Sequence, residues 1–499
     1  MRDGLFRGVI GAAARPGAAV LLGVAVLLTG CAVGPDYHRP AAETPPAWQP
    51  VEPWHEAAPG DTVLKGAWWE LFQDPDLNPL VEQALTSNQN LRVAAARLEQ
   101  AQDQLTIARS ALFPSIGLTS SALRSRTSAN RPLSVYSVPN QSTVQNDFQI
   151  GPSVNYELDL FGRVRREVEG ARATAEQAQA DFENTRLVLL AALVTDYYSL
   201  RELDAEIDVV RRSLDLERDA LNFVSSRHDL GFATGLDLAQ QQAVLDASAT
   251  QLELLQNQRA QFEHAIATMV GTPAPSFTLA ADATATPLPA LPVGLPSDLL
   301  QRRPDVASAE RAMAAANARI GVARAAYFPS INLAPGLGAP AAGWESNALA
   351  NLITAPSRFW SIGLSATQTL FDAGKTRANV RFADADYTAA VATYRQTVLT
   401  AMEEVENGIT GLSSLERAEV QANASVRSAQ RAYDIASDRY KGGVDTYLDV
   451  ITAQQTLLTN QRQAVQIQGQ QFATAVFLVK ALGGGWQGAP PGGAQASPR

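Results

Sequence analysis

The chain has 499 residues, of which 18% are charged, and its formal net charge at pH 7 is −10. This acidic balance excludes nucleic acid as a partner, because no basic stripe is available to displace counterions from phosphates. The 4 histidines and 1 cysteine show no HExxH or CxxC pattern, and no GxSxG or phosphate-binding glycine motif occurs. We therefore expect no metal site, no cofactor and no enzymatic activity.

The first 30 residues have the pattern of a bacterial lipoprotein signal peptide. Arginines precede an apolar run over 18–28, which is too short to span a bilayer as a helix. The LTGC that follows is similar to the lipobox, where the chain is cut before a cysteine that is then lipidated. Cys31 has no disulfide partner, so we expect it to carry lipid rather than to be a stray thiol. Ala32 follows it instead of Asp, which favours the outer membrane, where several acyl chains give a durable anchor.

Four stretches that almost lack proline and glycine are expected to be long helices. They are rich in Ala, Gln, Leu, Glu and Arg, most of which favour helices. Their ranges are 163–230, 236–270, 374–441 and 444–482, and shorter helices are expected at about 76–112 and 298–327. A helix over 163–230 would be about 100 Å long at about 1.5 Å per residue. Such lengths indicate a coiled-coil bundle or a helical tube.

Runs in which apolar and polar residues alternate are expected to be strands. FQIGPSVNYELDL (148–160) and WSIGLSATQTL (360–370) alternate throughout, and shorter runs follow each FPS. The expected strands are about 113–125, 148–160, 328–338 and 359–371. Alternation is most common in half-buried strands of soluble sheets. However, membrane-spanning strands need about 9–11 residues, whereas strands of soluble proteins average about five or six, so we favour transmembrane strands.

The two halves of the chain resemble each other. ARSALFPSI (108–116) corresponds to ARAAYFPSI (323–331), LFGR to LFDAGK, and RHDLGFATGLDL to RYKGGVDTYLDV. Each half has the order helix, strand, loop, strand, long helix, tip, helix, which predicts a duplicated unit. The expected parts are a signal peptide 1–30, a lipidated extended segment 31–75, a first repeat 76–272, a proline-rich linker 273–297, a second repeat 298–482 and a disordered tail 483–499.

Four strands cannot close a barrel within one chain. Open edges in hydrocarbon would leave backbone N–H and C=O groups unpaired, at a cost of several kcal/mol each. Two copies would give eight strands, whose interior is filled by side chains, whereas three would give twelve and leave room for water. A conduit is therefore expected to be a homotrimer.

The chain resembles the outer-membrane channel lipoproteins of tripartite efflux pumps, the TolC/OprM-like outer-membrane factor family, over nearly all of 31–482. The most specific pieces are LTGCAVGPDYHRP, ELDLFGRVRR, LLQRRPDVASAERAMAAANARIGVARAAYFPSI and RYKGGVDTYLDVITAQ. The resemblance implies an α+β membrane protein. Four transmembrane β-strands per chain would complete a 12-stranded barrel in the trimer, and long antiparallel helices would form a periplasmic α-barrel tunnel. The implied partners are a periplasmic adaptor (a membrane fusion protein) and an inner-membrane transporter of the resistance-nodulation-division type.

In that family the helix tips close the tunnel like an iris, and the matching tips here are 227–238 and 439–450. Gly231 and Gly443 are expected to permit the turns. The residues that the resemblance places at the periplasmic aperture are Asp237, Asp449, Asp445, Tyr440, Tyr447 and Leu448. The alternative for the first two is helix N-capping after a glycine turn, and both roles can hold.

One position departs from the family pattern. Asp445 stands where TolC-like members have an arginine that ties neighbouring helices together. We therefore expect the closing contacts to differ and to use Arg227 or Arg439.

The sequence thus favours a passive efflux channel for drugs or other small molecules in the outer membrane. One alternative is the outer-membrane component of a protein (type I) secretion system, because the same duct serves both. A non-conducting structural lipoprotein, such as a helical scaffold or an adhesin, is a further alternative, against which the alternating strands argue.

Overall fold

The computed structural model describes residues 32–39, 67–129, 143–283, 288–289, 303–343 and 354–484. The predicted signal peptide over 1–30, Cys31 and the tail after 484 lie outside these residues. The chain forms two compact units, each assembled from three separate stretches of sequence. The first holds 1–39, 100–175 and 311–391, and the second holds 40–99, 176–310 and 392–499.

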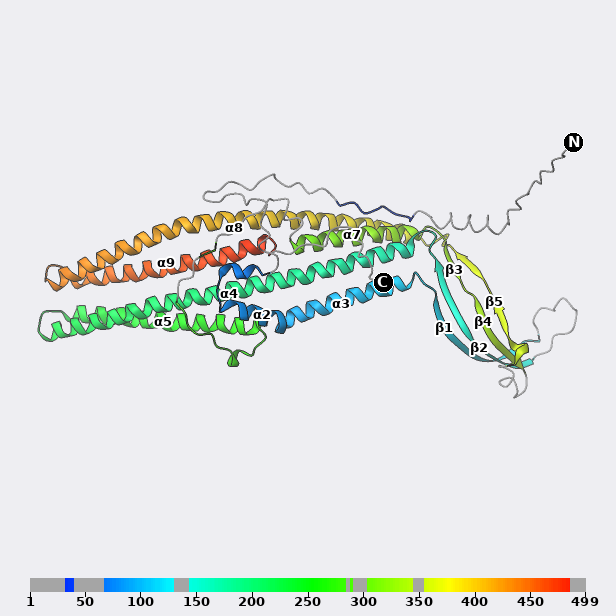
Figure 1. Cartoon of the computed structure of the whole chain (residues 1–499), viewed down its shortest axis with the longest axis horizontal. Helices are drawn as coiled ribbons and strands as arrows, with labels where there is room; N and C mark the ends of the chain where they lie inside the picture. The colour runs from blue at the N-terminus through cyan, green and yellow to red at the C-terminus, as the bar shows by residue number, and fades with distance from the viewer. Residues whose placement is uncertain are drawn as a thin grey trace, which may run out of the picture. The chain divides into compact units, whose positions relative to one another are not determined.

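The first unit contains an antiparallel sheet. Its strands are β1 (Ser115–Thr127), β2 (Thr143–Leu158), β3 (Ser330–Leu333), β4 (Gly336–Gly343), β5 (Phe359–Ser361) and β6 (Leu364–Thr367). β2 pairs with β1 on one side and with β3 and β4 on the other, and these pair in turn with β6 and β5. Four extended segments thus lie side by side in chain order (Figure 1). In the described part of the chain, β1 and the β5–β6 segment each pair on one side only.

Two of the expected strands are interrupted. The range 328–338 holds β3 and the start of β4, and the range 359–371 holds β5 and β6. The break in the first of these lies at Ala334 and Pro335, because proline has no N–H to donate to a strand ladder. The Ala334 N–H donates to the Gly363 carbonyl at 3.0 Å, so the two segments remain joined across the break.

The cross-strand register sorts the side chains onto one apolar and one polar face. Ile116 lies opposite Val154, and Leu118 lies opposite Pro152. Side chains alternate along a strand, so the intervening pairs share the other face. These pairs are Gly117–Ser153, Thr119–Gly151 and Ser121–Gln149. Ile116 and Leu118 are each 75% exposed, so the unit presents apolar side chains outward from its sheet.

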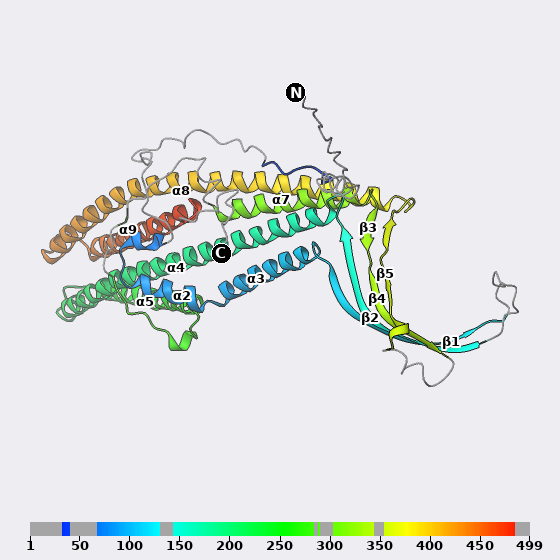
Figure 2. The ribbon, with the colours of Figure 1, turned by 45° about the vertical axis from the view of Figure 1, so that its right-hand side comes forward.

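Long helices make up most of the second unit. α4 (Arg163–Asp229) and α8 (Lys375–Lys441) enter it from the first unit. Each turns back into a shorter antiparallel helix, α5 (Gly235–Met269) and α9 (Tyr447–Ala481), which lies alongside it (Figures 1 and 2). α4 and α8 have 67 residues each, and α5 and α9 have 35 each.

Of the two shorter helical ranges, one differs from expectation and the other begins outside the described residues. The range 76–112 is broken at Asn88 into α2 (Leu77–Ser87) and α3 (Gln89–Ser110). The Asn88 side chain accepts the Leu91 N–H at 3.0 Å and donates to the Met269 carbonyl at 2.8 Å, so it caps the new helix and fixes it to the end of α5. In the range 298–327, α7 (Pro304–Ala325) begins at Pro304, a residue suited to the first helical turn.

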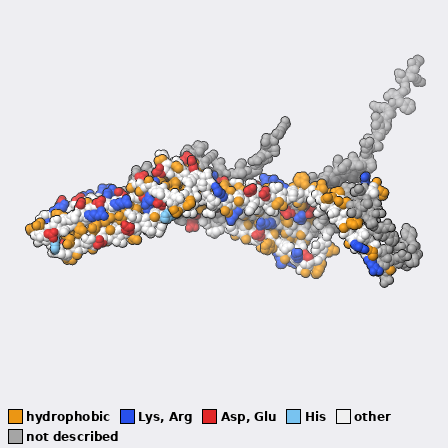
Figure 3. Space-filling view, turned by 90° about the horizontal axis from the view of Figure 1, so that it is seen from below, with side chains coloured by type: hydrophobic (Ala, Val, Ile, Leu, Met, Phe, Trp, Pro, Cys, Tyr) orange, Lys and Arg blue, Asp and Glu red, His pale blue; other side chains and the backbone are white. Residues whose placement is uncertain are grey.

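The core of the second unit lies where the segment before α2 packs among the long helices. Trp68 and Phe72 of the short 3-10 helix η1 (Trp68–Phe72) are buried there. Tyr198 of α4 stacks on Phe472 of α9, with ring centroids 4.4 Å apart. On the face drawn in Figure 3, acidic and basic side chains are interspersed and neither sign gathers into one patch. Within the described ranges, no helix has both the length and the apolar character needed to cross a membrane.

Candidate functional site

The tips of the two helical hairpins have the same backbone design. Gly231 and Gly443 have φ angles of 82° and 74°, a left-handed conformation that favours glycine. The N–H of Gly231 donates to the His228 carbonyl at 2.9 Å, and that of Gly443 donates to the Tyr440 carbonyl at 3.0 Å. The next residue in each tip donates to the carbonyl five positions back, which completes a Schellman motif. The expected turn glycines therefore end α4 and α8.

Of the two aspartates that follow the turns, only Asp237 makes a helix-capping contact. Asp237 forms a capping box with Thr234, in which each side chain accepts the other residue's backbone N–H. Asp449 accepts the Thr446 hydroxyl at 2.7 Å and is exposed, as is its neighbour Leu448. The carboxylate of Asp237 is therefore committed to the start of α5, whereas that of Asp449 faces solvent at the start of α9.

Arg439 and Asp445 form an ion pair across the second tip. The guanidinium donates two hydrogen bonds, at 2.5 and 2.8 Å, to the two carboxylate oxygens. These bonds hold the pKa of Asp445 below its ordinary value. Arg227 instead lies over the ring of Tyr440, 4.9 Å from its centroid, and donates to the Tyr440 carbonyl at 3.4 Å. The acid that departs from the family pattern is thus paired within its own tip, and Arg227 bridges the two hairpins.

A buried hydrogen bond joins α9 to α5 close to the tips. The Tyr447 hydroxyl donates to Gln241 Oε1 at 2.6 Å, and Gln241 Nε2 donates to the Glu217 carbonyl oxygen at 2.9 Å. Three helices are therefore joined through one buried amide. Tyr440 packs against Tyr447, with ring centroids 4.9 Å apart, but its buried hydroxyl makes no hydrogen bond to any described residue.

A buried acid beside this bond was not anticipated from the sequence. Glu217 occupies a position in the apolar stripe of α4 that includes Val210, Leu214 and Val224, and it is 1% exposed. One carboxylate oxygen accepts hydroxyls from Ser213 and Ser248, each at 2.9 Å. Burial raises the pKa of Glu217, and the two hydroxyls oppose this shift. This buried acid could have been predicted from the sequence, because a charged residue stands at an apolar heptad position.

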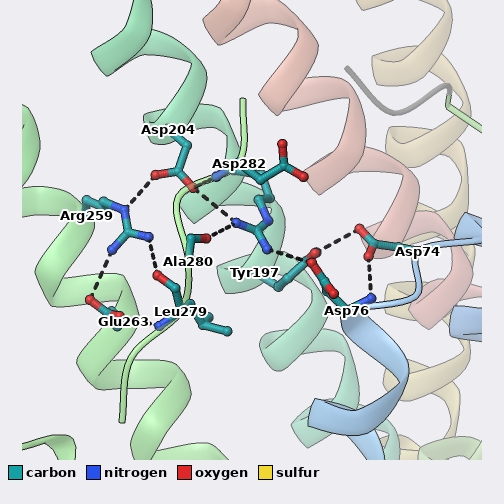
Figure 4. A network of polar contacts seen from close by, with 10 residues as sticks. Asp74, Asp76, Tyr197, Asp204, Arg259, Glu263, Leu279, Ala280 and Asp282 are labelled. Atoms are coloured by element: carbon teal, nitrogen blue, oxygen red, sulfur yellow. Dashed lines mark hydrogen bonds and ion pairs between the residues drawn. The ribbon is translucent and has the colours of Figure 1, made fainter. Parts of the chain in front are cut away.

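A second polar network lies on the α4–α5 hairpin, near the other end of α5 (Figure 4). Asp204 of α4 accepts Arg259 of α5 at 2.6 Å and the backbone N–H of Asp282 at 3.1 Å. Tyr197 donates to Asp74 at 2.9 Å. The network ties the segment after α5 and the segment before α2 to α4.

Glu202 gives the second unit a pH-dependent stability. Its carboxylate occupies the space that a Cβ on Gly469 of α9 would need, and Glu206 lies one turn along α4. Burial and the Glu206 charge raise the pKa of Glu202 to about 7. The folded protein therefore holds this proton more tightly than the unfolded chain, so the free energy of unfolding falls as pH rises from about 4.5 to about 7.

We expect Glu202→Gln to remove this pH dependence and to be more stable than the parent at pH 8 by about 1 kcal/mol, allowing for partial solvent exposure. Thermal unfolding between pH 5 and pH 8 measures it. Glu206 is held by Arg462 at 2.6 Å, so Glu206→Gln serves as the contrasting variant and should destabilise instead. Parallel pH profiles of the parent and Glu202→Gln would contradict the assignment.

Within the described residues, no group of three or more His, Cys, Asp or Glu side chains could hold a metal ion. The arrangement instead offers paired helical hairpins with polar contacts at their tips and a sheet with an exposed apolar face. These are features of a channel component.

Comparison with known proteins identifies the family. A family model described as outer membrane efflux protein matches residues 80–272 and 295–484, so the chain belongs to that family. It is 34% identical over 475 residues to the toluene efflux pump outer membrane protein TtgF of Pseudomonas putida, covering 93% of this chain and 96% of that one. It is 31% identical over 468 residues to the pyoverdine export outer membrane protein OpmQ of Pseudomonas aeruginosa, covering 94% and 96%.

Solved structures of outer-membrane channels have the same fold. The channel OprN matches with a TM-score of 0.82 and 32% identity, covering 92% of this chain and 100% of that one. The open state of the MtrE channel of Neisseria gonorrhoeae matches with a TM-score of 0.76 and 27% identity, covering 92% and 99%. The resemblance to the OprM/TolC-like outer-membrane factors is therefore confirmed. The protein is an outer-membrane efflux component with a helical tunnel fold, and its family is one of channels rather than enzymes.

Proposed function

We propose that the protein is the passive, trimeric exit duct of a tripartite efflux pump, which expels small molecules. The observation that carries this proposal is a sheet with an exposed apolar face and two edges that, among the residues the structure describes, pair on one side only. In hydrocarbon, those edges need strands from further copies. Three copies with four extended segments each would close a barrel of about twelve strands with a wet interior.

We infer the remaining parts of the pump from the relatives of this chain. The matched relatives are outer-membrane proteins of pumps named for toluene efflux and pyoverdine export, which supports a small-molecule cargo here. A periplasmic adaptor and a resistance-nodulation-division transporter in the inner membrane would supply the cargo and the energy. Lipid on Cys31 would anchor the duct, and the two alike hairpins would be an internal duplication.

Purified protein in planar bilayers tests the duct. We expect discrete conductance steps and a complex with the mass of three chains in detergent. A monomer without conductance would contradict the proposal.

We further propose that the hairpin tips form an aperture that opens like an iris. Asp237, Asp445, Asp449, Tyr440, Tyr447 and Leu448 would line or brace it, with Gly231 and Gly443 setting the turns and Arg227 and Arg439 supplying the pairing cations. Copies of the exposed Asp449 carboxylate from three chains would form a negative ring that favours cations.

Asp449→Asn is therefore expected to lower the cation-to-anion permeability ratio by about twofold or more, because it removes three charges from the ring. Reversal potentials in a salt gradient measure the ratio. Asp215→Asn is the control, since it removes an exposed carboxylate from α4 well before the tip. Equal ratios in the Asp449 variant and the parent would rule out the ring.

A further inference from the structure

The segment that directly follows Cys31 is held against the first unit. In this N-terminal segment (residues 32–39), the Val33 N–H donates to the Phe161 carbonyl at 3.0 Å, in the turn between β2 and α4. The Pro35 carbonyl accepts the Asn317 side chain of α7 at 3.0 Å. The segment is thus bound by two elements that are far apart in the sequence.

Arg166 of α4 is the main binding group for the N-terminal segment. It is only 5% exposed, and it donates to the carbonyls of Val33 and Gly34 at 3.4 Å each. It also forms ion pairs with Asp36 and Glu169, each at 2.7 Å. If the segment leaves, this guanidinium loses its contacts with Val33, Gly34 and Asp36 and keeps only the ion pair with Glu169, so undocking is costly.

Glycines allow the main chains to approach each other at two places. A Cβ on Gly34 would lie 2.5 Å from the Gly321 Cα, and a Cβ on Gly162 would lie 2.7 Å from the Ala32 Cα. Neither spacing can accommodate a larger residue without movement of the segment. Tyr37 packs against the small side chains of Ala173, Ala314 and Ala315 beyond these contacts.

These contacts join three parts of the sequence that the channel function leaves unexplained. AVGPDYHR supplies the N-terminal segment, LFGRVRR supplies Gly162 and Arg166, and ANARIGVA supplies Asn317 and Gly321. All of them lie in the first unit, which also contains the sheet. The shared feature is a docking site for residues 32–39, built from Gly162, Arg166, Asn317 and Gly321.

We propose that this docking site fixes the lipid-bearing Cys31 beside the turn where β2 ends and α4 begins, so that acyl chains and strands enter the membrane at one place. The proposal rests on the lipidation of Cys31 proposed above. Cys31 is bonded to Ala32, so its Cα lies about 3.8 Å from a docked residue. If residues 32–39 were instead a flexible linker, its root-mean-square end-to-end distance would be about 15 Å, and the lipid could lie that far from the strands. Docking therefore raises the effective concentration of the strands at the membrane surface.

Gly321→Ala tests the docking site, with Gly170→Ala as a matched control. Both variants add a methyl group to a helical glycine and gain similar helix propensity. At position 321 the Cβ would lie 2.7 Å from the Arg166 Cγ and 3.0 Å from the Val33 carbonyl oxygen, so it would press on both sides of the docking site. At position 170 the nearest atom is the Ala318 Cβ at 3.5 Å. Arg166→Gln removes the same contacts from the other side.

Hydrogen exchange of the full-length lipidated protein measures directly whether residues 32–39 are docked. In Gly321→Ala and Arg166→Gln, a peptide over residues 32–39 should exchange at least about tenfold faster, while peptides from α4 and α7 keep their protection. Gly170→Ala should match the parent. Unchanged exchange of residues 32–39 in both test variants would overturn the docking site.

Insertion into lipid vesicles then tests the link to the lipid. Channels per vesicle should fall at least about threefold in Gly321→Ala when Cys31 is lipidated. In a Cys31→Ala protein exported through a cleavable signal peptide, Gly321→Ala should cause no further loss. If Gly321→Ala lowered the number of channels equally in the lipidated and the Cys31→Ala proteins, its role would be structural only, and the proposal would be overturned. Hydrogen exchange can be measured whether or not the protein conducts. A parent protein that forms no channel would contradict the proposed duct, whereas protection of residues 32–39 in that protein would still support the docking site.

Discussion

Arg303→Ala is expected to lower the free energy of unfolding by about 2 to 3 kcal/mol, because it removes a buried guanidinium and leaves two half-buried acids without their ion pairs to it. Arg303 donates to Glu404 of α8 at 2.6 Å, to the Ala481 carbonyl at the end of α9 at 3.0 Å, and to both oxygens of Asp305. One buried guanidinium therefore joins the start of α7 to two other helices. This accounts for the first part of the RRPDV sequence.

Denaturant or thermal unfolding in detergent measures the loss in the Arg303 variant. Arg319→Ala in α7 is the control, since its ion pair with Asp386 at 3.2 Å is largely exposed. That control should lose less than about 1 kcal/mol. If Arg303→Ala and Arg319→Ala were equally stable, the buried ion pairs would not be what holds α7.

Tyr447→Phe is expected to raise the open probability of the reconstituted channel by about tenfold. The substitution keeps the ring in its apolar contacts but deletes the hydroxyl that donates to Gln241, so a buried amide oxygen is left unpaired at about 1 to 2 kcal/mol. On the proposed iris mechanism, opening would move the α8–α9 hairpin away from α5, so we take the hydrogen-bonded arrangement of the tips as the closed one. Loss of this bond weakens only the closed arrangement, and about 1.4 kcal/mol corresponds to a tenfold shift.

Tyr440→Phe provides a closely matched control for the Tyr447 variant. Tyr440 is buried in the same cluster, but its hydroxyl has no hydrogen-bond partner among the described residues. Its removal should leave gating unchanged. Single-channel recordings of the two variants under one voltage protocol distinguish them, and equal open times in both would assign the effect to ring packing instead.

The sequence predicts the long helices well because the residues that end them act locally, without distant partners. Proline and glycine are nearly absent inside them, and the tip glycines end α4 and α8 by their own backbone preference. The observed α4 and α8 accordingly begin and end within about a residue of the expected 163–230 and 374–441.

The features that the sequence does not predict depend on distant partners. The break at Asn88 needs the Met269 carbonyl, and the buried position of Arg303 needs Glu404. The contacts at the tips could not be predicted from the sequence for the same reason. The resemblance names Tyr440 and Tyr447 together. Only the structure shows that the Tyr447 hydroxyl is hydrogen-bonded, whereas that of Tyr440 has no such bond within the described part of the chain.

The matched helix lengths limit how this protein can vary in evolution. α4 and α8 are equal in length, as are α5 and α9, and the Tyr447–Gln241 bond joins the hairpins at their tips. A seven-residue deletion in α8 and α9 alone would shift one tip by about 10 Å relative to the other. A shorter or longer relative must therefore carry compensating changes in both halves, so that insertions and deletions arise as coordinated heptads.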